Sequence, residues 1–203
     1  MTLSAACVDK LVAHYWLLTK WNRAVRLVGD TDPQVVVRRH IMESLALIPF
    51  IHEPSGSLLD IGSGNGYPAI PLKAAMDQLR LAMLEPTVRK GAFLNAAISE
   101  AHLTDASVIR GRVDRPKDLA RWGRWDCISM RAVAAIGPVL DGAAQALRPS
   151  GRVVLMLGAA GREQAISRMS GPLRLIVDSR LPETRASWIV VAELADVTKE
   201  TIH

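Results

Sequence analysis

Apolar residues recur along this chain with two different periods. In residues 4–28 and 33–50 they return every three or four positions, which predicts two helices. Beyond residue 55, short apolar runs alternate with helical stretches. Strands that alternate with helices in this way predict an α/β fold, in which a mainly parallel sheet is doubly wound, with helices on both faces.

The predicted strands end in a pair with no clear helix between them, which indicates an antiparallel hairpin at one edge of the sheet. A Pro-Ser-Gly turn is expected at 149–151. The predicted strands are 58–61, 79–84, 107–109, 125–130, 153–157, 173–177 and 187–194. One helix is expected to begin at Pro68, and four more are expected at 88–101, 115–121, 139–147 and 164–169.

A break in the pattern at Glu53-Pro54-Ser55-Gly56 predicts a boundary between two parts. We expect residues 1–54 to form an N-terminal helical cap and residues 55–203 to form the main domain. Asp32 before Pro33 has the residue types of a helix N-cap and first helical position.

Composition narrows the class of protein. The chain has 203 residues, of which 49% are hydrophobic and 22% are charged, as in a globular protein. No apolar run approaches the roughly 20 residues of a membrane span, and the N-terminus lacks the pattern of a secretory signal. Cys7 and Cys127 have neither metal-site nor disulfide-framework spacing, and no histidine pair has metal-site spacing. We therefore expect a cytoplasmic protein without a metal.

Charge leaves two interpretations open. The net charge is +5 and the sequence pI is about 9.6, which is compatible with a polyanionic partner. Seven cations between residues 110 and 131 form either a solvated basic face or a nucleic-acid surface. They are Arg110, Arg112, Arg115, Lys117, Arg121, Arg124 and Arg131.

The stretch from Ser57 to Leu72 carries the strongest chemical signal. Gly62, Gly64 and Gly66 follow an apolar strand and precede a helix, so the backbone can turn tightly and approach a ligand without a Cβ. Dinucleotide sites favour G-x-G-x-x-G, whereas this spacing is G-x-G-x-G. Asp60 before it would repel a pyrophosphate, which disfavours NAD and favours the cationic S-adenosylmethionine. A glycine-rich turn without a ligand is the alternative.

Four polar residues fall where predicted strands end, the edge at which such sheets bind ligands. Asp60 ends the first strand, Glu85 the second and Arg131 the fourth, and Asp114 follows the third. Glu85 is placed to accept hydrogen bonds from ribose hydroxyls, Asp114 from an adenine amino group, and Arg131 faces the substrate. Each residue has an alternative interpretation. Asp60 is then a turn cap and Glu85 a helix-start acid, while Asp114 is an N-cap and Arg131 a surface cation.

His40 and Glu43 are i,i+3 neighbours in the second predicted helix. This spacing would suit metal binding or acid–base work, but no other His or Cys lies nearby in the sequence. We interpret them as a helix-surface pair.

Several motifs occur in an order typical of one family: KWNRAVRLVGDTDP, RRHIMESLAL, LLDIGSGNGYPAIPL, RKGAFL and MRAVA. Through them the chain, from about Tyr15 to Gly158, resembles the ribosomal RNA small subunit methyltransferase G family, also called glucose-inhibited division protein B. The resemblance implies a Rossmann-like class I methyltransferase with a seven-stranded sheet and one antiparallel strand. It also implies methyl transfer from S-adenosylmethionine to N7 of a guanine in 16S ribosomal RNA.

The resemblance also implies roles for individual residues. Gly62 and Tyr67 would line the cofactor site, Val113 and Asp114 its adenine region, and Glu85 would be the ribose-binding acid. Arg131 matches the family's arginine after the fourth strand, and we assign it to catalysis as well as to the cofactor. The expected partner is ribosomal RNA or the small ribosomal subunit, bound by a monomer.

Four positions depart from the family's pattern. Met130 replaces its usual Ser, Leu157 its usual Lys, and Arg26 and Val28 its usual Asn and Thr. We expect Leu157 to remove a cation from the catalytic face, and the arginines of 110–124 are candidates to replace it. The alternatives are a methyltransferase for another nucleic acid or a small molecule, or a non-catalytic RNA-binding module.

Overall fold

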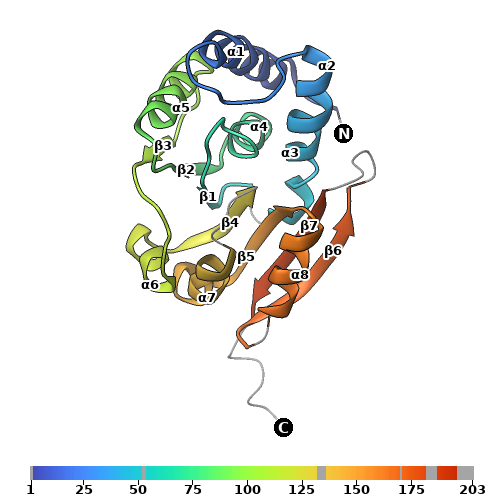
Figure 1. Ribbon diagram of the computed structural model, residues 1–203, viewed down its shortest axis with the longest axis vertical. Coiled ribbons are helices and arrows are strands. Elements are labelled where there is room, and N and C mark those ends of the chain that lie inside the picture. Colours follow the sequence, from blue (N-terminus) through green and yellow to red (C-terminus); the bar gives the residue numbers. More distant parts are fainter. Residues whose placement is uncertain (1, 52–53, 132–135, 170, 182–186, 196–203) are drawn as a thin grey trace.

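The computed structural model describes residues 2–51, 54–131, 136–169, 171–181 and 187–195 (Figure 1). Its strands are β1 Ser57–Ile61, β2 Arg80–Leu84, β3 Ala106–Ile109, β4 Trp125–Arg131, β5 Leu147–Leu157, β6 Leu173–Arg180 and β7 Trp188–Leu194. Its longer helices are α1 Ala5–Asn22, α4 Ala69–Ala75, α5 Val88–Glu100, α7 Ile136–Ala146 and α8 Ala159–Ser167. Shorter segments are α2 Pro33–Val36, the π-helix η1 Val37–Met42, α3 Glu43–Leu45, η2 Ile48–Phe50, α6 Pro116–Leu119 and η3 Ala120–Trp122.

The seven strands form one sheet in the order β3-β2-β1-β4-β5-β7-β6. Neighbours from β3 through β5 pair in parallel, whereas β7 is antiparallel to both β5 and β6. The predicted seven-stranded, mainly parallel sheet and its antiparallel edge hairpin are therefore confirmed. Within that hairpin the last strand lies inside and β6 forms the outer edge.

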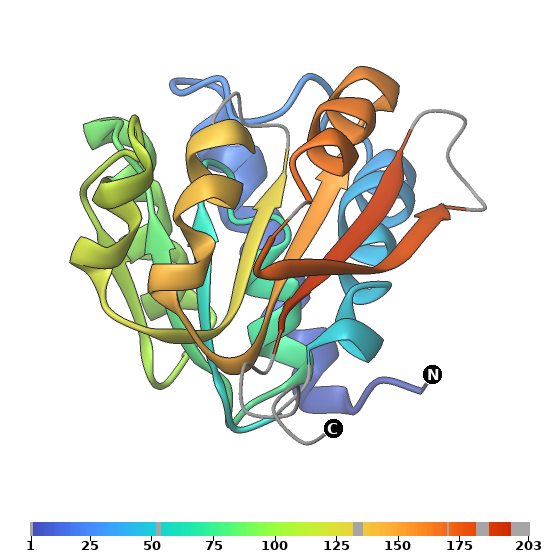
Figure 2. The same ribbon diagram turned by 90° about the horizontal axis from the view of Figure 1, so that it is seen from below.

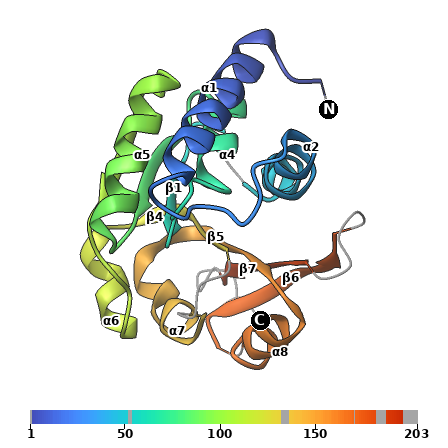
Figure 3. The same cartoon turned by 45° about the horizontal axis from the view of Figure 1, so that its top comes forward.

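Helices cover both faces of the sheet (Figures 1 and 3). α1, α4 and α5 lie on one face together with the α2–α3 segment, and α6, α7 and α8 lie on the other. The view from below shows the strands side by side, with helices in front of the sheet and behind it (Figure 2). β1 lies between β2 and β4, and all five of its residues are buried, as expected for a parallel strand that is covered on both faces.

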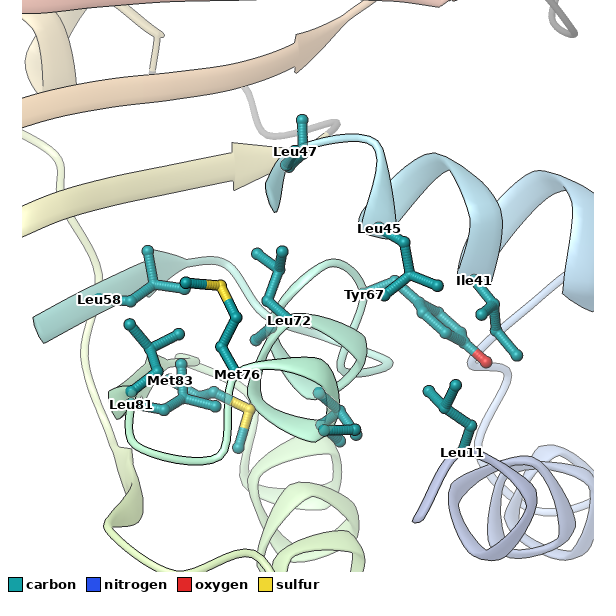
Figure 4. Close-up of a cluster of buried hydrophobic side chains, with 14 of the residues drawn as sticks. Leu11, Ile41, Leu45, Leu47, Leu58, Tyr67, Leu72, Met76, Leu81 and Met83 are labelled. Atoms are coloured by element: carbon teal, nitrogen blue, oxygen red, sulfur yellow. The ribbon is translucent and has the colours of Figure 1, made fainter. Parts of the chain in front are cut away.

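Successive residues of β1 contribute to two separate cores because side chains alternate across a strand. Leu58 packs in the core under α1, α4 and α5, and Leu59 packs in the core under α7 and α8. The first core also joins the N-terminal helices to the sheet (Figure 4), where Ile41 and Leu45 lie beside Tyr67. The division of the chain at residue 54 stays a prediction.

The first helix is shorter than its apolar period predicts. It ends at Asn22, whose side-chain oxygen accepts hydrogen bonds from the backbone N–H groups of Leu27 (2.7 Å) and Val28 (2.9 Å). This polar contact folds the following segment into a loop. Val28 is apolar because it is buried in that loop, and not because the helix continues.

The second helix is confirmed from Asp32, whose carboxylate caps Gln34 and Val35, as far as Leu45. The expected turn at 149–151 occurs inside β5, where the pairing with β4 shifts register between Trp125 and Cys127. Ser150 has a φ of 59°, so this segment bulges out of an otherwise continuous strand. Among the described residues, no helix has the length and apolar content to cross a membrane.

Candidate functional site

The glycine loop follows β1 and is built from residues in the left-handed region. Gly62, Gly64 and Gly66 have φ values of 72°, 51° and 85°, which L side chains rarely adopt. The N–H of Gly62 donates to the Leu84 carbonyl at 2.8 Å, which ties the loop to the end of β2. A Cβ on Gly66 would lie 2.5 Å from Cδ1 of Ile70, so the chain needs glycine there for space as well as for φ.

Glu85 holds this loop from the end of β2. Its Oε2 accepts a hydrogen bond from the N–H of Gly64 at 3.0 Å, and its Oε1 accepts one from Thr87 at 2.8 Å. The side chain is buried, and each carboxylate oxygen has a second lone pair for a ligand hydroxyl. Glu85 therefore joins the loop to the place where α5 begins.

Asp60 lies buried below the loop. Its Oδ1 accepts a hydrogen bond from Ser129 Oγ at 2.7 Å, because the two residues are register partners on β1 and β4. Its Oδ2 is buried without a hydrogen-bond partner among the described residues. Burial raises the pKa of Asp60 to about 6, against the lowering effects of Ser63 and Ser129.

A cavity of about 380 Å³ opens beside the glycine loop at the carboxyl ends of β1 and β4. This is the edge of a doubly wound sheet at which ligands bind. The lining residues are Leu27, Val28, Gly29, His40, Gly62, Gly64, Asn65, Tyr67, Lys90 and Arg131.

Arg131 joins this cavity to the N-terminal helices. Its Nη2 donates to Glu43 Oε2 at 2.6 Å and to the Arg39 carbonyl at 2.7 Å. Its Nη1 is buried without a hydrogen-bond partner among the described residues, although the side chain lines the cavity. Burial lowers the pKa of Arg131 and raises that of Glu43, while each group's charge opposes the other's shift.

The interpretation of His40 and Glu43 as a helix-surface pair is wrong. Glu43 is only 6% exposed and pairs with Arg131, whereas His40 lines the cavity and stacks on Tyr67 with ring centroids 5.0 Å apart. The i,i+3 spacing correctly places both on one side of the helix, but it does not say that this side faces the sheet. Burial, followed by the charges of Arg131 and Arg39, lowers the pKa of His40 to about 4.

A second histidine supports the loop from α1. His14 is fully buried, and its Nε2–H donates to the Asn65 carbonyl at 3.0 Å. Its ring also lies 4.9 Å from that of Tyr67, so Tyr67 lies between His14 and His40. Burial lowers the pKa of His14 to about 4 and raises that of the Tyr67 hydroxyl.

The structure brings together most of the predicted site residues, but not all. Gly62, Gly64, Tyr67 and Arg131 line the cavity, and Asp60, Glu85 and Gly66 adjoin it through the loop. Val113 packs in the core under α7 and α8, and Asp114 is exposed and pairs with Arg112 at 2.7 Å. Neither is among the cavity-lining residues, and the roles of all these residues stay predictions.

Sequence reasoning missed the cavity's outer wall. Asn65 lies inside the glycine loop, Lys90 lies in the first turn of α5, and residues 27–29 come from the loop after α1. The glycine stretch, RKGAFL and the N-terminal motif contain these residues, but none of the three motifs gave them a role. Their neighbourhood depends on how α1 and α5 pack against the sheet.

The departures at 130 and 157 lie in the core. Met130 and Leu157 are buried under α7 and α8, and Leu157 lies close to Gly161. Leu157 is not among the residues that line the cavity, and the expected loss of a cation from the catalytic face stays a prediction. Among the described residues, no group of three or more His, Cys, Asp or Glu side chains is placed to hold a metal ion.

The sheet order, its single antiparallel strand and the glycine loop after β1 together define a Rossmann-like class I methyltransferase fold. The fold is similar to that of an O-methyltransferase from Bacillus cereus in complex with SAH. That likeness has a TM-score of 0.63 and 17% identity and covers 92% of this chain and 96% of that one.

Sequence comparison identifies the particular family. The family model described as rRNA small subunit methyltransferase G, GidB, matches residues 8–172. A ribosomal RNA small subunit methyltransferase G of Stenotrophomonas maltophilia (strain K279a) is 33% identical over 84% of this chain and 78% of that protein. A ribosomal RNA small subunit methyltransferase G of Sorangium cellulosum is 34% identical over 81% of this chain and 70% of that protein. The chain belongs to this family.

Proposed function

We propose that this protein transfers a methyl group from S-adenosylmethionine to N7 of a guanine in 16S ribosomal RNA. The observation that carries the proposal is the cavity between the glycine loop and the His40–Arg131 wall, at the carboxyl ends of β1 and β4. Family membership supports the reaction class and the RNA substrate. We further propose that the protein acts as a cytoplasmic monomer and that its partner is the small ribosomal subunit.

The residues around the loop fit this cofactor. Gly62 and Gly64 present backbone without side chains to the cavity. The buried Nη1 of Arg131 has no hydrogen-bond partner among the described residues and could donate to a carboxylate such as that of the cofactor's methionine part. The carboxylate of Glu85 has lone pairs for ribose hydroxyls. Val113 and Asp114 are proposed for the adenine, at the far end of the loop after β3.

When bound, S-adenosylmethionine supplies a methyl group whose bond to sulfur breaks as the bond to N7 forms. Guanine N7 has a lone pair and no proton in the neutral base, so no general base is needed to begin the attack. The chain therefore contributes mainly position, by holding the base in line with the methyl group. The base becomes cationic on methylation, and the low pKa of His40 keeps the imidazole neutral beside it at neutral pH. The charge of Arg131 is balanced by Glu43.

The test is tritiated methyl transfer to 30S subunits, free 16S RNA and a metabolite pool, followed by mapping of the modified base. We expect label at a single guanine, in a product whose strand breaks at that base after borohydride reduction and aniline treatment, as it does at 7-methylguanosine. Label only in the metabolite pool would contradict the RNA substrate. RNA binding without label would indicate the non-catalytic module.

Gly62→Val tests the loop. A valine at a φ of 72° is strained, and Gly62 lines the cavity, so we expect cofactor binding in calorimetry to fall at least a hundredfold. The control is Gly171→Val, which has a comparable φ of 95° and open space around its Cβ. Unchanged cofactor binding in Gly62→Val, with wild-type circular dichroism, would refute the assignment.

A further inference from the structure

Two groups of exposed cations are candidates to contact a polyanion. The α6 group consists of Arg112, Arg115, Lys117, Arg121 and Arg124, on the loop after β3 and around α6 and η3. The mouth group consists of Arg26, Arg39, Arg89 and Lys90, which come from the loop after α1, from η1 and from the first turn of α5. The net charge of the chain does not distinguish them.

Neighbouring acids and rings distinguish them in part. In the α6 group Arg112 pairs with Asp114, Arg115 pairs with Asp118, and Arg121 lies over the ring of Trp122, whereas Lys117 and Arg124 make no ion pair with another described residue. No member of the mouth group makes an ion pair with another described residue. The carboxylate of Glu43, which feels the charge of Arg39, is buried and already paired with Arg131. The mouth group therefore keeps its positive charge available to a partner.

Each member of the mouth group lies in the cavity lining or next to a lining residue along the chain. Lys90 is part of the lining, Arg89 precedes it, and Arg26 and Arg39 are the immediate neighbours of the lining residues Leu27 and His40. Arg26, Arg39 and Arg89 are exposed, and Lys90 is half-buried. A base that enters this cavity carries its own phosphate and those of its two neighbours to the rim, because the backbone cannot follow the base inside. We expect those phosphates to reach the segments that carry these cations.

Resting on the proposed function, we infer that the RNA backbone docks on the mouth group, and that the α6 group is a solvated face. This places the RNA on the side of the sheet covered by α1 and α5 (Figure 3). The target base would then point between the glycine loop and η1. Phosphate contacts supply most of the salt-dependent affinity for nucleic acid, at a slope of about 0.7 per cation for single strands and about 0.9 for duplexes.

Two double variants with equal charge loss test this inference. Arg26→Gln/Arg89→Gln removes two exposed cations of the mouth group, and Lys117→Gln/Arg124→Gln removes two of the α6 group. We expect the mouth variant to weaken binding to 16S RNA at least tenfold and to lower the salt slope by about 1.4 to 1.8. The α6 variant should stay within twofold of the wild type. RNA affinity is measured by filter binding, and cofactor affinity by calorimetry should be unchanged in both variants.

Equal losses in the two variants, or a larger loss in the α6 variant, would overturn the inference. RNA affinity is measured directly, so it tests the docking surface independently of methyl transfer. If the wild type binds RNA through the mouth group but transfers no methyl group, the proposed function fails and the docking surface stands. If the wild type methylates RNA and the mouth variant binds as tightly as the wild type, the surface fails and the function stands.

Discussion

At the scale of single residues, burial decides the chemistry of the site more than the residue types do. Asp60, Glu43 and His40 are ordinary polar residues in the sequence, yet burial shifts the pKa of each in the direction that disfavours its charged form. Burial therefore keeps the imidazole of His40 neutral at neutral pH and raises the pKa of the Asp60 carboxyl group. Perturbed groups of this kind gather at functional sites more often than elsewhere.

The buried His14 makes the stability depend on pH. Its pKa is about 4 in the folded protein and about 6.5 in an unfolded chain, so the unfolded state takes up the proton first as the pH falls. Its contribution is therefore complete above pH 6.5 and is lost as the pH falls toward 4. From about pH 6.5 to about pH 5 this loss approaches 2 kcal/mol. Asp60 acts in the opposite direction, because its raised pKa favours the folded state at low pH.

The measurement is urea unfolding at about pH 7 and about pH 5 for the wild type and for His14→Gln. Glutamine can still donate to the Asn65 carbonyl but does not titrate. We expect the drop in unfolding free energy between the two pH values to be about 2 kcal/mol smaller in the variant. An identical drop in the two proteins would show that His14 does not cause it.

At the scale of elements, periodicity predicted which segments are helices and strands, and local polar contacts decided where they end. Asn22 ends α1 with its side-chain oxygen, although the apolar spacing continues toward residue 28. Strand β5 continues through a bulge at Ser150, where the sequence indicates only a turn. At a helix end the free energy that favours one more helical residue is small, so a few side-chain hydrogen bonds are sufficient to end the helix. Helix bounds are therefore harder to predict than the helices themselves.

Packing between elements gives two glycines opposite roles. A Cβ on Gly142 of α7 would lie 2.3 Å from the carbonyl oxygen of Pro116 in α6, so the two segments would have to separate. A Cβ on Gly91 of α5 would meet nothing closer than Val108 Cγ1 at 3.9 Å. We expect Gly142→Ala to destabilise the fold by about 1–3 kcal/mol, as overpacking does. Gly91→Ala should stabilise it by about 0.5–1 kcal/mol through helix propensity.

Both changes in unfolding free energy are measured by denaturant unfolding of the two variants and the wild type, monitored by circular dichroism. The opposite signs make the pair its own control, because each substitution adds the same methyl group to a helix. A stabilising Gly142→Ala would mean that α6 and α7 can move apart at little cost.

At the scale of the whole molecule, one ion pair connects parts of the chain that are 88 residues apart. Glu43 from the N-terminal helices and Arg131 from β4 meet at 2.6 Å beside the cavity. Glu43→Gln keeps the size and one hydrogen bond of the side chain but removes the acid that acts most strongly on Arg131. We expect a loss of about 1–3 kcal/mol in unfolding free energy, because a hydrogen bond to a charged group is weakened in a buried place.

A double-mutant cycle with Arg131→Met checks this prediction. If the two residues act as a pair, the double variant loses less stability than the sum of the two single variants. Additive losses would show that the pair contributes nothing beyond its separate side chains.

The sequence by itself determined the alternation of strands and helices, the class of fold and the glycine loop with its preceding acid. These features depend on short-range periods and on glycine's freedom at positive φ, which neighbours in the chain are sufficient to reveal. Only the tertiary structure decided that Glu43 pairs with Arg131, that His40 stacks on Tyr67 and that Val113 packs in a core while Asp114 pairs with Arg112. Each of these results joins segments distant in sequence, and their meeting depends on how the helices pack across the sheet.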